Sequence, residues 1–370
     1  MSMMLFLNMR QIALFLVFSF YTSLALGQAD YQYDVPEFLN DDWKVNSLQS
    51  QNINASLYEQ FINAMNKEDH ELHSMLLIKN NELIFEKYFG EHSVDKQHDL
   101  RSVTKSITSL ILGIAIEKEY VQSLDDPISR YLGEFDNPKN PDPRKNQITI
   151  RDFLTMSSGL ECNDWDPKSK GQEDKMYKKK DWIQFMANLP MLHDPGEIST
   201  YCTGGTILIA EIIERTSGLS LPDFAQKHLF EPMGIENLSW GHTNKKTVIS
   251  SGQRLNMTSR DMAKLGQLIL NKGTWMGKEL IPAYWIEELA TPKTKITGLN
   301  YSYLWWQLPF TKNGVLEPSI CATGNGGQYI LTFPELDLVA IFTGGAYNSP
   351  KDKLPFTVVN RIILPSIKDN

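Results

Sequence analysis

A serine and a lysine three residues apart, Ser102 and Lys105, are the residues of this chain best suited to covalent chemistry. Residues three apart on a helix share a face, so the hydroxyl and the amine come within reach of each other. A neutral amine can accept the serine proton, and both burial and the positive end of a helix dipole lower the pKa of a lysine. The pair therefore predicts a serine nucleophile with lysine as its base.

The spacing of Ser102 and Lys105 also has simpler interpretations. Ser102 would serve equally well as the N-cap of a helix without any chemistry. Ser93 and Lys96 repeat the same spacing, but no periodic apolar segment follows them. After Ser102, apolar residues recur at helical intervals, namely at Ile107, Leu110, Ile111, Ile114 and Ala115. We therefore favour Ser102, and further groups must complete the site.

Serine catalysis also needs a proton carrier for the leaving group and donors that stabilise an oxyanion. Tyr201 lies in a turn-rich segment just before a helical pattern, where its hydroxyl would face a cleft. The alternative is a tyrosine that only packs. The glycine-rich segment 323–328 leads into a strand, and its glycines let backbone N–H groups approach a ligand closely. The alternative there is an ordinary turn.

The two ends of the chain have the patterns of β-strands. Residues 75–78 and 83–89 are apolar or alternating and are separated by polar turn residues, which predicts a hairpin. Residues 328–333 and 336–342 flank Pro334 and Glu335 in the same way. Residues 356–364 then predict a closing amphipathic helix.

Between these ends the chain is mainly helical in pattern. Thr258 and Asp261 predict a capping box, and Gly218 predicts a helix end. We expect an α+β fold in which an antiparallel sheet, built from N- and C-terminal segments, is flanked by helices and carries a helical subdomain at about residues 125–290. The cleft at that junction is the expected site. Apolar residues have helical spacing in 150–156, 182–189, 205–216, 221–229 and 262–270.

Residues 1–27 have the features of a signal peptide. They carry one charge, Arg10, followed by an apolar run and by small residues before Gln28. We expect export to the periplasm or the medium, an N-terminal extension at 28–71 and the main domain at 72–370. An uncleaved N-terminal anchor is the alternative. The net charge of −8 argues against nucleic acid as a partner.

Three cysteines, Cys162, Cys202 and Cys321, allow at most one disulfide within the chain, and their spacing fits no zinc motif. His70 and His73 are three residues apart without a carboxylate pattern beside them, which favours surface or packing roles. We therefore expect neither a metal nor a cofactor.

The order and content of these segments resemble the class C β-lactamase-related serine hydrolases, which have the penicillin-recognising fold. The resemblance runs from about Leu72 to the C-terminus. It implies that Ser102 is the acylated nucleophile, Lys105 its base and Tyr201 the proton shuttle. It also implies an oxyanion hole made by the backbone N–H groups of Ser102 and Gln328. The matching segments are Ser102 to Lys105, the motif led by Tyr201, the third motif before the last hairpin, residues 153–160, and Pro195 with Gly196.

Two positions depart from the family pattern. Thr203 replaces the usual Asn of the second motif, and neutral Asn325 stands where the third motif usually has Lys or His. The resemblance gives these two residues, with Gly326 and Gly327, a place in substrate binding. Loss of a charge-assisted bond removes roughly 1.5–3 kcal/mol of anchoring for a substrate carboxylate. The loss of this bond argues against an efficient β-lactamase or carboxypeptidase. Within the family, the arrangement of residues is more similar to that of esterases and 6-aminohexanoate-oligomer hydrolases.

The sequence thus predicts an exported serine hydrolase that cleaves ester or amide bonds of a small molecule through an acyl-enzyme. The alternative is a non-hydrolytic, penicillin-binding-like sensor or binding module for cell-wall fragments, which would hold a long-lived adduct on Ser102. Residues 162–181 are expected to form part of the cleft rim, with a solvated loop as the alternative. The aromatic run 301–306 fits either the rim or the core.

Overall fold

The computed structural model describes residues 30–241 and 254–368, so the expected signal peptide at 1–27 lies outside the described residues. The chain divides into two compact units, residues 1–32 and 33–370, and the second contains all the elements below. Within the described ranges, none of the helices combines the length and apolarity that a membrane span needs.

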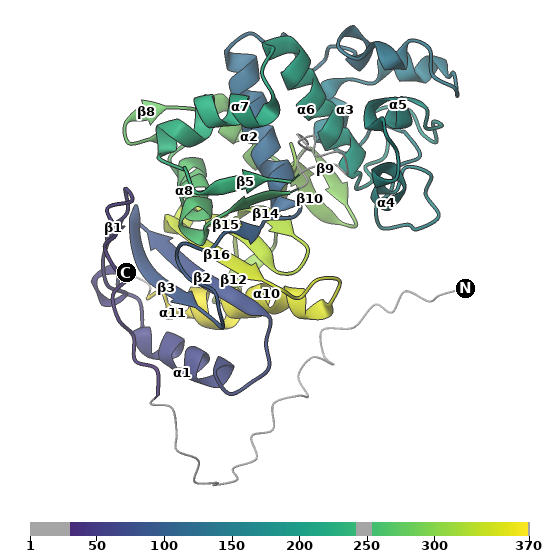
Figure 1. Cartoon of the computed structure of the whole chain (residues 1–370). Helices are drawn as coiled ribbons and strands as arrows, with labels where there is room; N and C mark the ends of the chain where they lie inside the picture. Colours follow the sequence, from purple (N-terminus) through teal and green to yellow (C-terminus); the bar gives the residue numbers. More distant parts are fainter. Residues whose placement is uncertain (1–29, 242–253, 369–370) are drawn as a thin grey trace. The chain divides into compact units, whose positions relative to one another are not determined.

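The described residues form a nine-stranded sheet that joins the two ends of the chain (Figure 1). β2 (Leu72–Lys79) pairs directly with β16 (Leu338–Gly344), in antiparallel register. All the other pairings are antiparallel except that of β1 with β3. The order is β1 (Lys44–Val45), β3 (Glu82–Tyr88), β2, β16, β15 (Gln328–Phe333), β14 (Ile320–Gly324), β11 (Trp305–Gln307), β10 (Leu299–Ser302) and β9 (Thr294–Ile296). The expected antiparallel sheet is confirmed.

The predicted hairpin of β2 and β3 closes through a two-residue turn. Asn80 and Asn81 both have positive φ, 52° and 62°. This is the requirement of a type I′ turn, whose twist matches that of the flanking strands. Asparagine tolerates the left-handed region better than most residues, so the turn chemistry fixes the register.

Helices cover both faces of the sheet, and β15 and β16 are buried at every position. α8 (Ser259–Leu270) packs on one face, where a Cβ added to Gly266 would lie 2.5 Å from Val339 and 3.1 Å from Ile330. Tyr329 points to the opposite face, because successive side chains alternate. There its ring contacts Phe356 of α10 (Leu354–Val358). On that side the chain closes with α11 (Leu364–Ser366), whose Ser366 hydroxyl bonds Tyr58 of α1 (Ala55–Met65).

The helical part gathers around α2 (Val103–Glu117), which is buried from its first residue to Ala115 (Figure 1). α2 packs against α6 (Thr203–Ser217), and Gly113 lets Trp285 of α9 (Ala283–Ala290) approach it. Gly218, with φ of 72°, ends α6 as predicted. The five helical patterns correspond to α3 (Ile150–Leu154), α5 (Trp182–Ala187), α6 (Thr203–Ser217), α7 (Leu221–Ala225) with the π-turn Gln226–Phe230, and α8.

A small three-stranded sheet contains β4, the strand that precedes Ser102 and α2 in the chain. β4 (His98–Asp99) pairs with β6 (Leu255–Met257), which also pairs with β5 (Leu238–Trp240). The remaining strands form the hairpins of β7 (Thr274–Trp275) with β8 (Lys278–Glu279) and of β12 (Phe310–Lys312) with β13 (Val315–Glu317).

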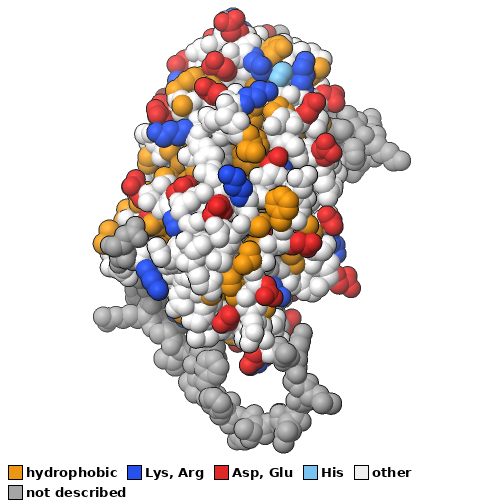
Figure 2. All heavy atoms as spheres, turned by 90° about the vertical axis from the view of Figure 1, so that its left-hand side faces the viewer, with side chains coloured by type: hydrophobic (Ala, Val, Ile, Leu, Met, Phe, Trp, Pro, Cys, Tyr) orange, Lys and Arg blue, Asp and Glu red, His pale blue; other side chains and the backbone are white. Residues whose placement is uncertain are grey.

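The surface carries charges of both signs. On the face in Figure 2, Lys and Arg side chains are interspersed with Asp and Glu among the described residues. A polyanion needs a continuous basic surface. The described side chains of this face do not provide one.

Candidate active site

Ser102 and Lys105 meet at the start of α2. Ser102 is the residue before the helix, Lys105 lies in its first turn, and the Lys105 Nζ donates a hydrogen bond to the Ser102 Oγ at 2.9 Å. The lysine is 3% exposed. The preceding residue, Arg101, has a φ of 49°, in the left-handed region where such residues are strained. Asp99 holds it there through the Arg101 backbone N–H and through an ion pair with its guanidinium at 3.2 Å.

The first turn of α2 is hydrogen-bonded to residues 304 and 305, at the start of the strand β11 that carries Trp306. The Ser106 hydroxyl donates to the Leu304 carbonyl at 2.6 Å, and the Trp305 Nε1 donates to the Ser106 carbonyl at 3.1 Å. Tyr303 and Leu304 both have positive φ, 41° and 68°. These bonds fix the helix end, and with it Ser102, against β11.

Tyr201 completes the predicted group of three. Its ring is stacked between Trp165 and Trp306, with centroid distances of 4.9 Å and 6.2 Å. The Lys105 Nζ lies 5.2 Å from the centre of the Tyr201 ring. The serine, lysine and tyrosine proposed from the sequence therefore converge, although they come from two different segments of the chain.

All three residues line one cavity of about 590 Å³. A cavity of this size is in the ordinary range for a small-molecule site. Its wall carries charges of both signs, which are the cations Arg101, Lys105, Arg254 and Lys353 and the carboxylates Asp164, Glu173, Asp174 and Asp352. The aromatic run 301–306 is buried, with Trp306 on the cavity wall and Tyr301 in the core, so it serves both roles that the sequence left open.

The glycine-rich third motif reaches the cavity only at its first residues. Thr323, Gly324 and Asn325 line the wall. The Asn325 amide donates to the Asn348 side chain at 2.8 Å and accepts the Asn348 backbone N–H at the same distance. Outside helices and strands in the described chain, neither the Asn325 N–H nor the Ser102 N–H donates to a backbone carbonyl.

Gly326, Gly327 and Gln328 shape the turn and do not lie on the cavity wall. Gly326 has a φ of 94°, and a Cβ there would lie 2.5 Å from Tyr347. Gln328 is fully buried, and its side-chain amide donates to the Gly344 carbonyl at 2.6 Å. The Gln328 side chain is thus held inside the hairpin, while the roles expected for its backbone N–H as an oxyanion donor and for the two glycines in substrate binding stay predictions.

Thr203 does not point into the cavity either. It is 1% exposed, its hydroxyl donates to the Glu173 Oε2 at 3.0 Å, and its backbone N–H donates to the Asp164 Oδ2 at 2.6 Å. The two carboxylates stand between Thr203 and the cavity, and they line it in its place. Asp164 and Glu173 thus lie next to Thr203 on the cavity wall, and the expected substrate-binding role of Thr203 stays a prediction.

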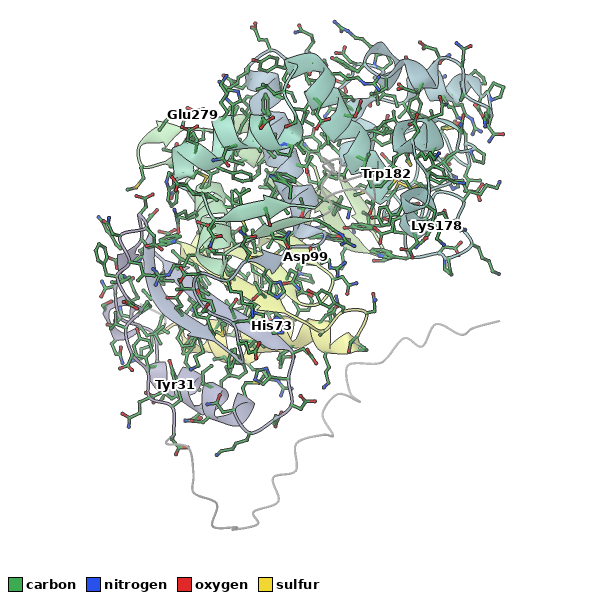
Figure 3. The ribbon with its side chains drawn as sticks, viewed as in Figure 1. Tyr31, His73, Asp99, Lys178, Trp182 and Glu279 are labelled. Atoms are coloured by element: carbon green, nitrogen blue, oxygen red, sulfur yellow. A yellow bond between two sulfur atoms is a disulfide. The ribbon has the colours of Figure 1, made fainter. Side chains whose placement is uncertain are left out.

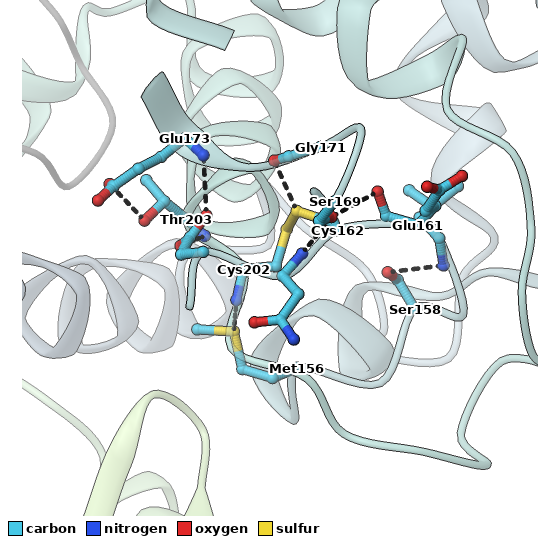
Figure 4. The surroundings of a disulfide bond; sticks show 12 residues. Met156, Ser158, Glu161, Cys162, Ser169, Gly171, Glu173, Cys202 and Thr203 are labelled. Carbon is cyan, nitrogen blue, oxygen red and sulfur yellow. Dashed lines mark hydrogen bonds between the residues drawn. A yellow bond between two sulfur atoms is a disulfide. The ribbon is translucent and has the colours of Figure 1, made fainter. Parts of the chain in front are cut away.

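A disulfide between Cys162 and Cys202 holds the segment that supplies these carboxylates (Figure 4). It joins the residue next to Tyr201 to the start of the segment 162–181. Asp164, Trp165, Glu173 and Tyr177 of that segment line the cavity, so the expected rim is confirmed. The single disulfide agrees with the limit set by three cysteines, and Cys321 is free and buried.

The electrostatics of Lys105 differ from the sequence prediction. Burial by itself would lower the pKa of Lys105, but Tyr201, Glu173 and Asp164 outweigh it and the pKa is raised. Burial, opposed by the charge of Lys105, raises the pKa of Asp164 to about 6. The groups around Lys105 therefore favour its ammonium form.

Asp164 and Glu173 are the residues that the sequence analysis did not identify. No motif marks them, because they reach Lys105 through a disulfide whose pairing the sequence left open. The only available signal was the clustering of acidic and aromatic residues after Cys162.

Comparisons with known proteins agree with this geometry. The sequence profile of the family described as Beta-lactamase matches residues 63–355. The chain belongs to the beta-lactamase family. It is a serine hydrolase, and its fold is the β-lactamase/transpeptidase-like fold.

Individual relatives are distant in sequence. An uncharacterized protein of Alkalihalophilus pseudofirmus is 26% identical over 316 residues, covering 75% of this chain and 85% of the relative. The 6-aminohexanoate-dimer hydrolase of Paenarthrobacter ureafaciens is 22% identical over 286 residues, covering 72% and 71%. A solved class C beta-lactamase has a TM-score of 0.64 at 16% identity and covers 85% of this chain and 96% of its own, which is a likeness of fold.

Proposed function

We propose that this serine hydrolase is exported and cleaves an ester or amide bond of a small molecule through an acyl-enzyme on Ser102. The observation that carries the proposal is the 2.9 Å bond between Lys105 and Ser102 on the wall of a cavity that also contains Tyr201. The disulfide between Cys162 and Cys202 supports export, because disulfides persist in oxidising compartments.

In acylation, Lys105 acts as the base in its neutral form. Its Nζ accepts the proton of Ser102 while the Oγ bonds to the carbonyl carbon. The negative charge that forms on the carbonyl oxygen is stabilised by the backbone N–H groups of Ser102 and Gln328, the two donors that the family resemblance implies.

Collapse of the tetrahedral intermediate breaks the bond to the leaving group. The Tyr201 hydroxyl gives that group its proton and recovers one from the Lys105 ammonium, whose Nζ lies 5.2 Å from the centre of the Tyr201 ring. Water then attacks the acyl-enzyme, its proton passes to the same pair of residues, and Ser102 leaves with a proton as the acid product forms. The reaction consumes one water and needs no other reactant.

The mixed charge of the cavity supports a polar, small substrate. The 162–181 side carries carboxylates, and Arg101 and Lys353 lie on the same cavity wall. Such a wall suits a linear amide or ester that carries an amine at one end and a carboxylate at the other. The relative named as a 6-aminohexanoate-dimer hydrolase makes linear ω-amino acid amides the first candidates.

The test measures hydrolysis of p-nitrophenyl acetate, the linear dimer of 6-aminohexanoate and nitrocefin by the protein and its Ser102→Ala and Lys105→Ala variants. We expect turnover of the ester by the unaltered protein, loss of at least about 1,000-fold in Ser102→Ala, and a slow burst in Lys105→Ala. Unchanged ester turnover by Ser102→Ala would overturn the assignment. An adduct without product release would favour the binding module.

A further inference from the structure

Three histidines from separate segments converge on the side of the sheet near β4. His73 lies in β2, His92 follows β3, and His98 begins β4. Figure 3 labels His73 on β2 and Asp99, the residue after His98, on the neighbouring segment. One ring nitrogen from each histidine lies within 4.8 Å of the other two. None of the three residues lines the catalytic cavity.

Two of the three rings approach each other within hydrogen-bond distance. The His73 Nδ1 and the His98 Nε2 are 2.7 Å apart. The His98 Nδ1 faces the Asp99 carbonyl at 3.3 Å. A histidine that donates one N–H to a backbone carbonyl leaves its other nitrogen as the ligand atom, which is the usual outer-shell arrangement of metal-binding histidines.

We propose that His73, His92 and His98 bind one divalent transition-metal cation of the Zn²⁺ class, with a fourth position open to solvent. Imidazole is a ligand that Zn²⁺, Cu²⁺ and Ni²⁺ share. His73 and His92 are partly exposed and His98 is 8% exposed, so a cation can enter from solvent while one ligand is fixed by burial.

The rings need only a small movement to close on a cation. Zn–N distances of 2.0–2.1 Å imply ligand nitrogens about 3.4 Å apart in a tetrahedral site. The His73 and His98 nitrogens must separate slightly. His92 is stacked on His73 with a centroid distance of 3.8 Å, and it must rotate out of that stack. His92 lies between strands, where such a rotation displaces no element.

The charges around the cluster are balanced. Lys96 opposes a cation electrostatically, and Glu91 favours it. The alternative is a metal-free trio that only stacks and hydrogen-bonds.

The sequence did not indicate this site, because it offered only the pair His70 and His73. His70 lies outside the cluster, where it faces the Leu72 backbone N–H and packs on Phe89. The two actual partners of His73 lie 19 and 25 residues further along the chain, positions 92 and 98. Pairing of β2 with β3 and the turn into β4 bring them together.

The experiment uses the full chain without a histidine tag, stripped of metal by a chelator. Zn²⁺ is titrated by calorimetry, and Co²⁺ by its visible spectrum, which distinguishes tetrahedral from octahedral coordination. We expect one equivalent to bind, a tetrahedral Co²⁺ spectrum and a higher Tm with Zn²⁺. His92→Ala should weaken binding by about 100-fold or more, since loss of even an outer-shell partner costs 10–100-fold.

His193→Ala is the matched control, because this partly exposed histidine lies outside the cluster. It should bind Zn²⁺ as the unaltered protein does. His73→Gln gives a second ligand loss if His92→Ala folds poorly. Absence of saturable binding by the unaltered protein, or equal binding by His92→Ala and His193→Ala, would overturn the site and favour the metal-free trio. Ester hydrolysis by Ser102 is measured separately and has no bearing on this result.

Discussion

At the scale of single residues, the protonation of Lys105 controls the proposed chemistry. Tyr201, Glu173 and Asp164 raise its pKa against the effect of burial. A raised pKa favours the ammonium, whereas only the neutral amine can accept the Ser102 proton, so the proposed base is the less abundant form at neutral pH. The hydrolysis rate should therefore increase with pH from neutral to alkaline conditions.

The Asp164→Asn variant tests whether neighbouring negative charges raise the pKa of Lys105. The amide keeps an oxygen that accepts the Thr203 N–H, but it removes a negative charge that raises the pKa of Lys105. The pKa of Lys105 should fall, the neutral amine becomes more abundant at a given pH, and the rising limb of the pH–rate profile moves to lower pH. The measurement is kcat/KM for an ester across pH.

The same comparison contains an internal control. The pKa of Asp164 is about 6, so below that pH the unaltered protein also has a neutral group at this position. The profiles of the two proteins should then converge on the acid side. A limb that stays in place or moves to higher pH would contradict the account of Lys105.

At the scale of elements, the disulfide between Cys162 and Cys202 holds the acidic rim against Tyr201. It closes a loop of sequence separation 40, for which chain entropy gives a stabilisation of roughly 4 kcal/mol. Trp165 stacks on Tyr201 from this loop with an interplanar angle of 3°. Its position depends on the crosslink.

Removal of the disulfide should reduce stability and substrate binding together. In the Cys162→Ala, Cys202→Ala double variant we expect a lower Tm and a higher KM, because Asp164 and Trp165 lose their fixed positions. Thermal unfolding and steady-state kinetics with and without a reductant are the measurements. The reductant should affect only the unaltered protein; an equal effect on the double variant would show that another group is responsible.

Elements with a strong local signal were predictable. The hairpin of β2 and β3, the end of α6 at Gly218 and the helix after Ser102 follow from turn chemistry and apolar spacing. The rim was only partly predictable. Asp164 and Glu173 reach the cavity wall on a segment held by a crosslink whose pairing depends on the fold. The backbone N–H of Gln328 stays a predicted oxyanion donor, because the direction of an N–H at a turn depends on backbone angles that the residue types do not fix.

At the scale of the whole molecule, a buried ion-pair group joins the start of unit 33–370 to its sheet. Arg260 is 3% exposed and pairs with Glu86 of β3 and with Asp41, the latter at 3.0 Å. It also donates to the Glu37 carbonyl at 2.8 Å. This ties residues before α1 to α8 and β3, which together support the sheet behind the active site.

Arg260→Ala should destabilise the protein by about 3–5 kcal/mol, because it leaves the buried Glu86 carboxylate without its cation. Denaturant unfolding measures the change. Arg361→Ala, at an exposed position, is the matched control and should change stability by less than about 0.5 kcal/mol. Equal effects of the two variants would refute the role of this group in holding the fold.

The proposed activity depends on acylation of Ser102, which covalent labelling detects. The folded protein is treated with a fluorophosphonate, digested, and the modified residue is located by tandem mass spectrometry. We expect a single label on Ser102 in the unaltered protein, less labelling of Ser102 in Lys105→Ala, and no labelling after denaturation. A label on another serine, or no label on active protein, would contradict it.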